Sequence, residues 1–153
     1  MIFRLQFLFL IKQTIYLKYI KIMFCRQDVI DYIKEKYNVE PEYLWPKYPD
    51  YCAFRNPETK KRFVCWIANI WKKFVNAWEE WTIDVIDVKS DPNMIEYLRT
   101  QPWLRPWYHM NKKHWLTILL WPMSPKEDLI KSLIDISYKY SCKDRKKLLW
   151  FRK

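Results

Sequence analysis

The sequence predicts an α+β fold, in which helices pack on an antiparallel sheet in the order α-β-β-β-α-β-β-α. Two observations carry this prediction. Apolar residues recur at helical spacing in three segments, and short apolar or alternating runs bounded by turn residues mark five strands. The chain has 153 residues and is 50% hydrophobic, so one domain with a substantial core is expected.

The first helix is predicted over residues 27–37. Its acidic residues lie near the start and its lysines near the end, as the helix dipole favours. The apolar face is formed by Val29, Ile30, Ile33 and Tyr37. Strands are predicted next over residues 51–55 and 62–70. The connector between them, Asn56 to Lys61, has the composition of a turn, so the two strands form a hairpin.

Residues 81–88 alternate in polarity, which predicts a half-exposed strand with Asp84 and Asp87 at solvated positions. A second helix is expected to start at Asp91-Pro92 and to end before Pro102. Its buried face is predicted to hold Met94, Ile95 and Leu98.

A second hairpin is predicted from strands 106–110 and 114–120, which flank Asn111-Lys112-Lys113. The last helix starts with a capping box, Ser124 to Glu127, with proline at its first position. Its apolar face is predicted to hold Leu129, Ile130, Leu133, Ile134 and Tyr138.

The net charge of +11 is concentrated at the two ends of the chain. Residues 1–22 carry four basic side chains and no acid, and residues 139–153 carry seven basic side chains and one acid, which leaves +1 for residues 23–138. We therefore expect one domain over residues 23–140, followed by a basic tail at 141–153. Total charge is weak evidence for what this domain binds.

Residues 1–22 are rich in phenylalanine, isoleucine, leucine and lysine. Their uninterrupted apolar run is too short to span a bilayer, so no integral membrane insertion is expected. Three interpretations stay open: an amphipathic segment on a membrane surface, a disordered or partly docked leader, and upstream sequence preceding a true start at Met23. We favour the third.

The four cysteines are Cys25, Cys52, Cys65 and Cys142. Their spacing does not match a zinc site, and without a secretory signal we expect reduced thiols in the cytoplasm. His109 and His114 are the two histidines, and a metal would need at least one further ligand. Neither a metal nor a cofactor is expected. Because no nucleophile and base are evident together, we predict that the protein is not an enzyme.

Three stretches resemble the MmcQ/YjbR family: RQDVIDYIKEKYNVEPEYLWPKYPDYCAFRN, TIDVIDVKSDPNMIEYL and QPWLRPWYHMNKKHWLTILL. The resemblance covers residues 24–138, and YHMNKKHW is its most specific part. It implies an α+β fold described as a double wing, similar to known DNA-binding domains, and a role in binding DNA. That role is inferred from the fold, so it is an argument by analogy.

Glycine is absent from the chain, whereas tryptophan occurs ten times. Trp103 and Trp107 stand where the family resembled here has glycine. One hypothesis is that several tryptophans are glycine codons translated under the wrong genetic code; the alternative is a chain that is truly rich in tryptophan. Under the first hypothesis, these positions need positive φ, and replacing both by glycine improves folding.

Two basic turns are the candidate DNA contacts: Lys112 and Lys113 flanked by His109 and His114, and Lys60, Lys61 and Arg62 with Arg55 opposite them. Lysines at hairpin tips can contact phosphates. They can equally be solvated residues that keep a turn soluble. The prediction is a DNA-binding module. The alternative is a protein-interaction or small-ligand module without nucleic acid, which the near-neutral middle of the chain favours.

Overall fold

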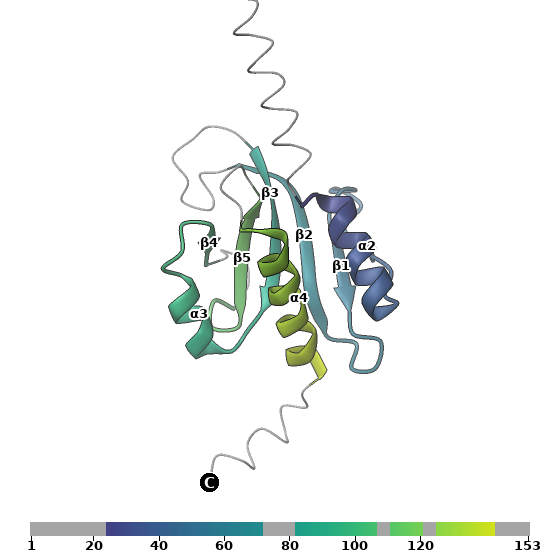
Figure 1. The fold of residues 1–153 in the computed structure, drawn as a ribbon. Coiled ribbons are helices and arrows are strands. Elements are labelled where there is room, and N and C mark those ends of the chain that lie inside the picture. Colours follow the sequence, from purple (N-terminus) through teal and green to yellow (C-terminus); the bar gives the residue numbers. More distant parts are fainter. Residues whose placement is uncertain (1–23, 72–81, 107–110, 121–124, 143–153) are drawn as a thin grey trace, which may run out of the picture.

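A computed structural model describes residues 24–71, 82–106, 111–120 and 125–142 of the chain. The order of helices and strands in this part confirms the predicted α-β-β-β-α-β-β-α arrangement (Figure 1). The elements are α2 (Arg26–Tyr37), β1 (Cys52–Arg55), β2 (Arg62–Trp71), β3 (Thr82–Lys89), α3 (Pro92–Leu98), β4 (Leu104–Arg105), β5 (Trp115–Leu120) and α4 (Glu127–Cys142).

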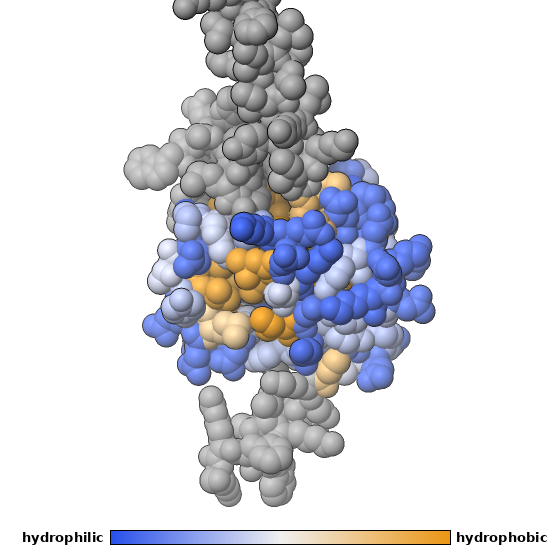
Figure 2. Space-filling view, viewed as in Figure 1, coloured by the Kyte–Doolittle hydropathy of each residue, from blue (hydrophilic) through white to orange (hydrophobic). Residues whose placement is uncertain are grey.

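The strands form one antiparallel sheet in the order β1-β2-β3-β5-β4. Helices α2 and α4 lie on the same face of this sheet, and α3 lies toward its β4 edge (Figure 1). The main core fills the space between these helices and the sheet; Trp66, Phe54 and Phe63 are its largest buried side chains. On the helix face, hydrophilic residues dominate around α2, and hydrophobic residues gather between α3 and α4 (Figure 2).

Local sequence accounts for where the helices begin and end. The Asp28 carboxylate accepts the Cys25 N–H at 2.7 Å, and α2 stops where Asn38 takes left-handed backbone angles. The Asp91 side chain accepts the Asn93 N–H at 3.0 Å and thereby caps α3, with Pro92 at the first position as predicted. Ser124, the predicted cap of α4, lies outside the described residues.

The prediction of a half-exposed β3 was wrong. Ile86 and Asp87 are both fully buried, because β3 is the central strand of the sheet and has covered side chains on both faces. A polar residue in an alternating strand is usually solvated, and here the position of the strand within the sheet overrides that pattern. Asp84 and Asp87 point to opposite faces, so they do not form a carboxylate pair.

Other predictions need smaller corrections. Leu129 and Met94 were expected in the core, but 38% and 41% of their surfaces are exposed. Helix α3 ends at Leu98, a few residues before Pro102, and the described strand β4 is the short pair Leu104–Arg105, which precedes the predicted strand 106–110. Residues 107–110 of that predicted strand lie outside the described part of the chain, as do the predicted leader and most of the basic tail.

The four cysteines are free thiols; Cys52 and Cys65 are buried, and Cys25 and Cys142 are exposed. Among the described residues, no helix is both long enough and apolar enough to cross a bilayer.

Trp103 does not occupy a glycine-like position. The described residues with positive φ are Asn38, Lys60 and Asn69, so the backbone of Trp103 does not require glycine. Its side chain is half-buried against the main core, and its carbonyl accepts the Leu119 N–H at 2.9 Å. The physical argument for a miscoded glycine is therefore wrong at Trp103. Trp107 lies outside the described residues.

Replacing Trp103 by glycine is accordingly expected to lower the free energy of unfolding by about 1–3 kcal/mol, because it removes buried aromatic surface and adds backbone freedom. Urea denaturation measures this change. Trp103→Phe is the matched variant, since it keeps an aromatic ring and should retain most of the stability. A glycine variant as stable as the parent would revive the miscoding hypothesis.

Candidate functional site

The first basic turn connects β1 to β2 and is organised by Asn56. The Asn56 side-chain oxygen accepts the N–H groups of Glu58 and Thr59 at 3.0 and 3.1 Å, and Lys60 adopts a left-handed backbone conformation with φ 56°. Asparagine stabilises turns by this type of bond to the following backbone. The sequence therefore holds Lys60 at an exposed position of a well-defined turn.

The second basic turn precedes β5 and follows the same principle. The Asn111 side chain accepts the Lys113 N–H at 3.0 Å, and its carbonyl accepts the His114 N–H at 2.9 Å. Arg99, just after α3, donates to the Lys112 carbonyl. Both lysines of this turn are exposed.

The two turns lie at the same end of the sheet. Arg62 begins β2 at this end, and Lys89, the last residue of β3, pairs there with Trp115, the first residue of β5. The C-terminal end of α4 also reaches this end (Figure 1). Lysines separated by about fifty residues in sequence thus lie at the same end of the sheet.

The last turn of α4 contacts both basic turns. Asn56 donates from its side-chain nitrogen to the Ser141 Oγ at 3.1 Å, and the Thr59 hydroxyl donates to the Ser141 carbonyl at 3.0 Å. On the other side, the Tyr140 hydroxyl lies 3.3 Å from His114 Nδ1. Adjacent residues of one helix therefore hold the two turns. We call the resulting surface the basic end; it is formed by Lys60, Lys61, Arg62, Lys112, Lys113 and Lys139.

The predicted contact residues differ in their availability. Lys60, Lys112 and Lys113 are exposed, whereas Lys61 and Arg62 are half-buried. Arg55 has a different role, because its Nε donates to Glu42 at 2.8 Å and its Nη1 donates to the Lys60 carbonyl at 3.2 Å. Arg55 thus supports the first turn from behind.

Of the predicted histidines, His114 is half-buried beside Tyr140, and His109 lies outside the described residues. Sequence reasoning missed Lys139 as a site residue, and it missed the anchors Asn56, Thr59 and Ser141. Only the Asn56-Pro57 pair carried a local signal, since asparagine followed by proline favours a turn.

Asp87 is a buried carboxyl on the sheet face opposite the helices. The Thr117 hydroxyl donates to its Oδ1 at 2.6 Å, and its Oδ2 has no hydrogen-bond partner among the described residues. Burial raises the pKa of Asp87 to about 7, against a smaller opposing effect of the Thr117 bond. The neighbouring Cys65 is also buried, which raises its pKa to about 12 and keeps the thiol protonated at neutral pH.

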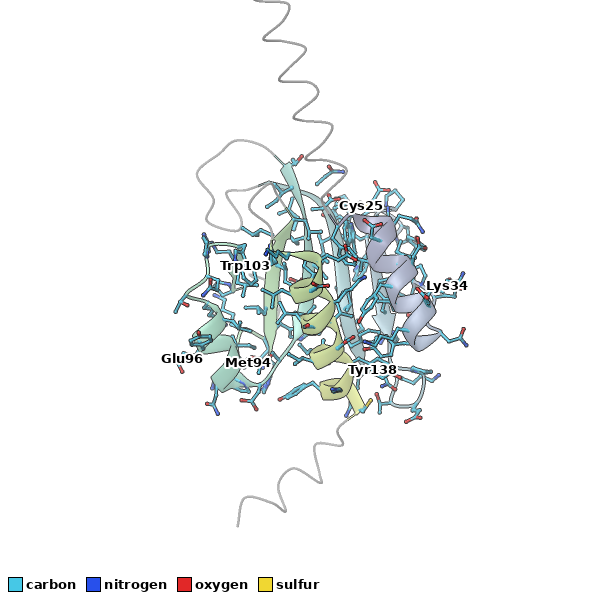
Figure 3. All side chains as sticks on the ribbon, viewed as in Figure 1. Cys25, Lys34, Met94, Glu96, Trp103 and Tyr138 are labelled. Atoms are coloured by element: carbon cyan, nitrogen blue, oxygen red, sulfur yellow. The ribbon has the colours of Figure 1, made fainter. Side chains whose placement is uncertain are left out.

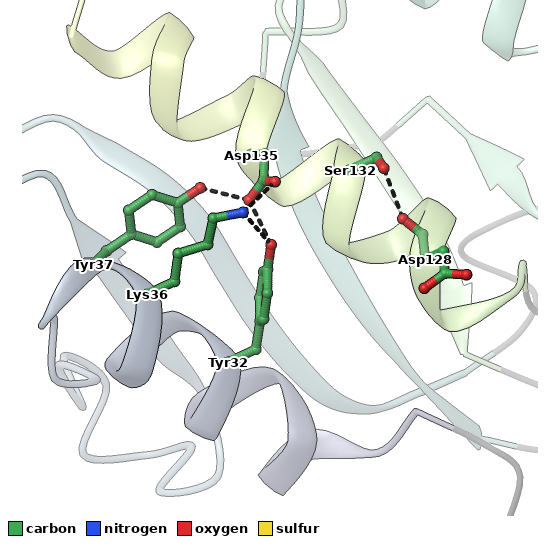
Figure 4. Close-up of polar contacts among 6 residues, drawn as sticks. All are labelled: Tyr32, Lys36, Tyr37, Asp128, Ser132 and Asp135. Atoms are coloured by element: carbon green, nitrogen blue, oxygen red, sulfur yellow. Dashed lines mark hydrogen bonds and ion pairs between the residues drawn. The ribbon is translucent and has the colours of Figure 1, made fainter.

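Helices α2 and α4 are joined through one carboxylate, Asp135. It accepts bonds from the Tyr32 hydroxyl at 2.7 Å, from the Lys36 ammonium at 2.6 Å and from the Tyr37 hydroxyl (Figure 4). Burial opposes ionisation of Asp135, but the three bonds outweigh burial and lower its pKa below the ordinary value. Beside this cluster a groove of about 480 Å³ opens between the C-terminal ends of the two helices.

A metal site finds no support in the described part of the chain, which has no cluster of three or more histidine, cysteine or acidic side chains suited to hold an ion.

Comparison with known proteins places these features in a family context. A family model described as YjbR matches residues 34–140 of this chain. The uncharacterized protein YyaQ of Bacillus subtilis (strain 168) is 34% identical over 116 residues, which are 76% of this chain and 97% of that protein.

Two structures of a protein from Pseudomonas syringae are also similar. The crystal structure has a TM-score of 0.71 at 36% identity and covers 76% of this chain and 98% of the other. The solution NMR structure has a TM-score of 0.70 at 35% identity and covers 79% and 95%. Protein DR2400 of Deinococcus radiodurans shares the fold alone, with a TM-score of 0.58 at 20% identity over 77% of this chain and 78% of that one.

Proposed function

The chain belongs to the YjbR family, and on that premise we propose that it is a double-wing DNA-binding module that contacts phosphates through the basic end. The observation that carries the proposal is that two basic turns from distant parts of the sequence meet at one end of the sheet, each in contact with the last turn of α4. The proposal is for a cytoplasmic binding module without catalytic activity.

The charge distribution argues for phosphate contacts rather than for reading of bases. Lys60, Lys112 and Lys113 are exposed, and a lysine ammonium is a mobile point charge that binds phosphate without selecting a base. Residues 23–138 carry a net charge of only +1, so a modest affinity with a strong salt dependence is expected. The same near-neutral charge favours the alternative, a protein-interaction or small-ligand module.

The test is a double charge reversal, Lys112→Glu with Lys113→Glu, in the full chain. Binding to a short DNA duplex is measured at roughly 50 and 200 mM salt. We expect affinity at low salt to fall at least about tenfold, and the slope of log affinity against log salt to decrease by roughly 0.9 for each phosphate that the variant no longer binds. The fold should be unchanged, because both side chains are exposed.

The matched control is Lys47→Glu with Lys126→Glu, which makes the same charge change at exposed positions away from the basic end. The sequence after Cys142 is itself basic, so each protein is also measured with Lys143, Arg145, Lys146 and Lys147 replaced by serine. Equal losses in the two charge reversals would show that binding is not located at the basic end. If the protein with these four serine replacements shows no salt-sensitive association with DNA, the proposal is refuted. The alternative, a protein-interaction or small-ligand module, then takes its place.

A further inference from the structure

The groove between α2 and α4 has the dimensions of a small-molecule site. Its volume of about 480 Å³ lies within the range of about 300–1,000 Å³ that is typical of ligand pockets. Residues from the ends of both helices line it: Lys36 and Tyr37 from α2, and Asp135, Tyr138, Lys139 and Cys142 from α4. Tyr138 lies near the C-terminal end of α4 on the side that faces α2 (Figure 3).

The wall of the groove is aromatic and rigid. The rings of Tyr37 and Tyr138 are stacked, with centroids 3.9 Å apart and an angle of 18° between the planes. The Phe63 ring lies at right angles to Tyr138, with the centroids 5.1 Å apart, and joins the pair to the core. Burial raises the pKa of the Tyr138 phenol, so this wall is uncharged at neutral pH. A rigid, neutral aromatic surface suits stacking of a flat ring.

The rim of the groove is cationic. Lys36 and Lys139 contribute two positive charges against the single negative charge of Asp135, so the lining carries +1. Helix C-termini bear partial negative charge, and these lysines lie in the last turns of α2 and α4, where they offset it. Lys36 is bound to Asp135, and Lys139 is an exposed lysine of the lining.

The groove is continuous with the basic end. Asn56 of the first turn donates to the Cys142 Sγ at 3.1 Å, and Cys142 lines the groove. We propose that the groove binds one nucleotide, with its base against the Tyr37–Tyr138 wall and its phosphate at Lys139. This inference rests on the proposed function and deepens it, because an unpaired base in a strand held at the basic end has the same chemistry as a free nucleotide.

The experiment titrates the full chain with 2′-deoxyadenosine 5′-monophosphate by calorimetry, and with ribose 5-phosphate, which has no base. We expect the nucleotide to bind at least about tenfold more tightly, since stacking of one base on an aromatic side chain supplies about that factor or more. Tyr138→Ala should weaken nucleotide binding about 5- to 100-fold, and Tyr138→Phe should retain it. Tyr97→Ala removes an exposed tyrosine of α3 that does not line the groove, so it is the control and should have no effect.

Tyr138→Ala removes packing, so Lys139→Ser serves as a second variant that leaves the core intact. It should weaken binding of the nucleotide but not of deoxyadenosine, which has no phosphate. Equal affinity for the nucleotide and ribose 5-phosphate, or a Lys139→Ser variant that binds the nucleotide as the parent does, would overturn the proposal.

A short oligodeoxyadenylate distinguishes the source of the nucleotide. Tighter binding of the oligonucleotide, lost in Tyr138→Ala, supports a single strand as ligand; equal binding of both supports a free nucleotide. DNA binding by the basic end and nucleotide binding by the groove are measured in separate titrations with separate variants, so failure of one proposal can be distinguished from failure of the other.

Discussion

As pH rises from about 4 to about 7, the parent is expected to lose up to about 4 kcal/mol of stability through the ionisation of Asp87. Asp87→Asn is expected to remove this loss. The carboxyl has a pKa of about 7 in the folded protein against 3.8 ordinarily, so the folded state binds its proton more tightly. The stability from that proton is fully present below about pH 4 and is lost as pH rises through about 7, at about 1.4 kcal/mol per unit. Asparagine does not titrate, and its oxygen can still accept the Thr117 hydroxyl.

Urea denaturation of parent and variant between about pH 4 and 8 measures this effect, with the difference between the two proteins as the readout. The difference should move in favour of Asp87→Asn as pH rises, and other titrating groups cancel. Asp84→Asn, on the same strand but facing the opposite side, is the matched control. Parallel curves for Asp87→Asn and its parent would show that the carboxyl ionises as freely in the folded state as in the unfolded chain.

Asn56→Ala is expected to lower the free energy of unfolding by about 2–4 kcal/mol. The side chain is fully buried and makes four hydrogen bonds, two within the turn and two to Ser141 and Cys142. Each such bond contributes roughly 0.5–1.5 kcal/mol, and the partners left behind are themselves poorly solvated. Because the first basic turn loses its anchor, the DNA binding proposed above should weaken as well.

Asn111→Ala is the matched control for that change. Asn111 has the same role in the second turn, accepting the Lys113 N–H, but its side chain is exposed and water can replace the lost bond. Asn111→Ala should therefore lower the free energy of unfolding by less than about 1 kcal/mol. Equal losses in the two variants would show that burial of Asn56 and its contacts with α4 add nothing to stability.

The elements of the fold were predictable because each has a local cause. Asp91-Pro92 marks the start of α3, and alternating or apolar runs mark the strands. The burial of Asp87 was not predictable from its own segment, because it depends on which strand lies at the centre of the sheet. Leu129 is partly exposed for a related reason. The sequence of a helix predicts which side of it is apolar, but it does not predict how much of that side the sheet covers.

For the candidate site, the sequence predicts the two basic turns but not how they are arranged in space. Basic residues between two strands indicate an exposed turn, and both turns are present. The two turns meet at one end of the sheet and contact α4, which depends on residues far apart in sequence. Asn56 and Ser141, for example, are more than eighty positions apart. The groove combines residues from the first and last described helices, so no local motif could have indicated it.

The Asp135 cluster also has a consequence for how the protein is made. Tyr32 and Asp135 are 103 residues apart, so α2 leaves the ribosome long before the helix it binds. Contacts between distant residues form only after a large loss of chain entropy, and they slow folding. During synthesis, the apolar side of α2 stays without its α4 partner until the last helix emerges. The contact between α2 and α4 therefore forms only after α4 has been synthesised, and a chain that stops before α4 lacks the bonds from α2 to Asp135.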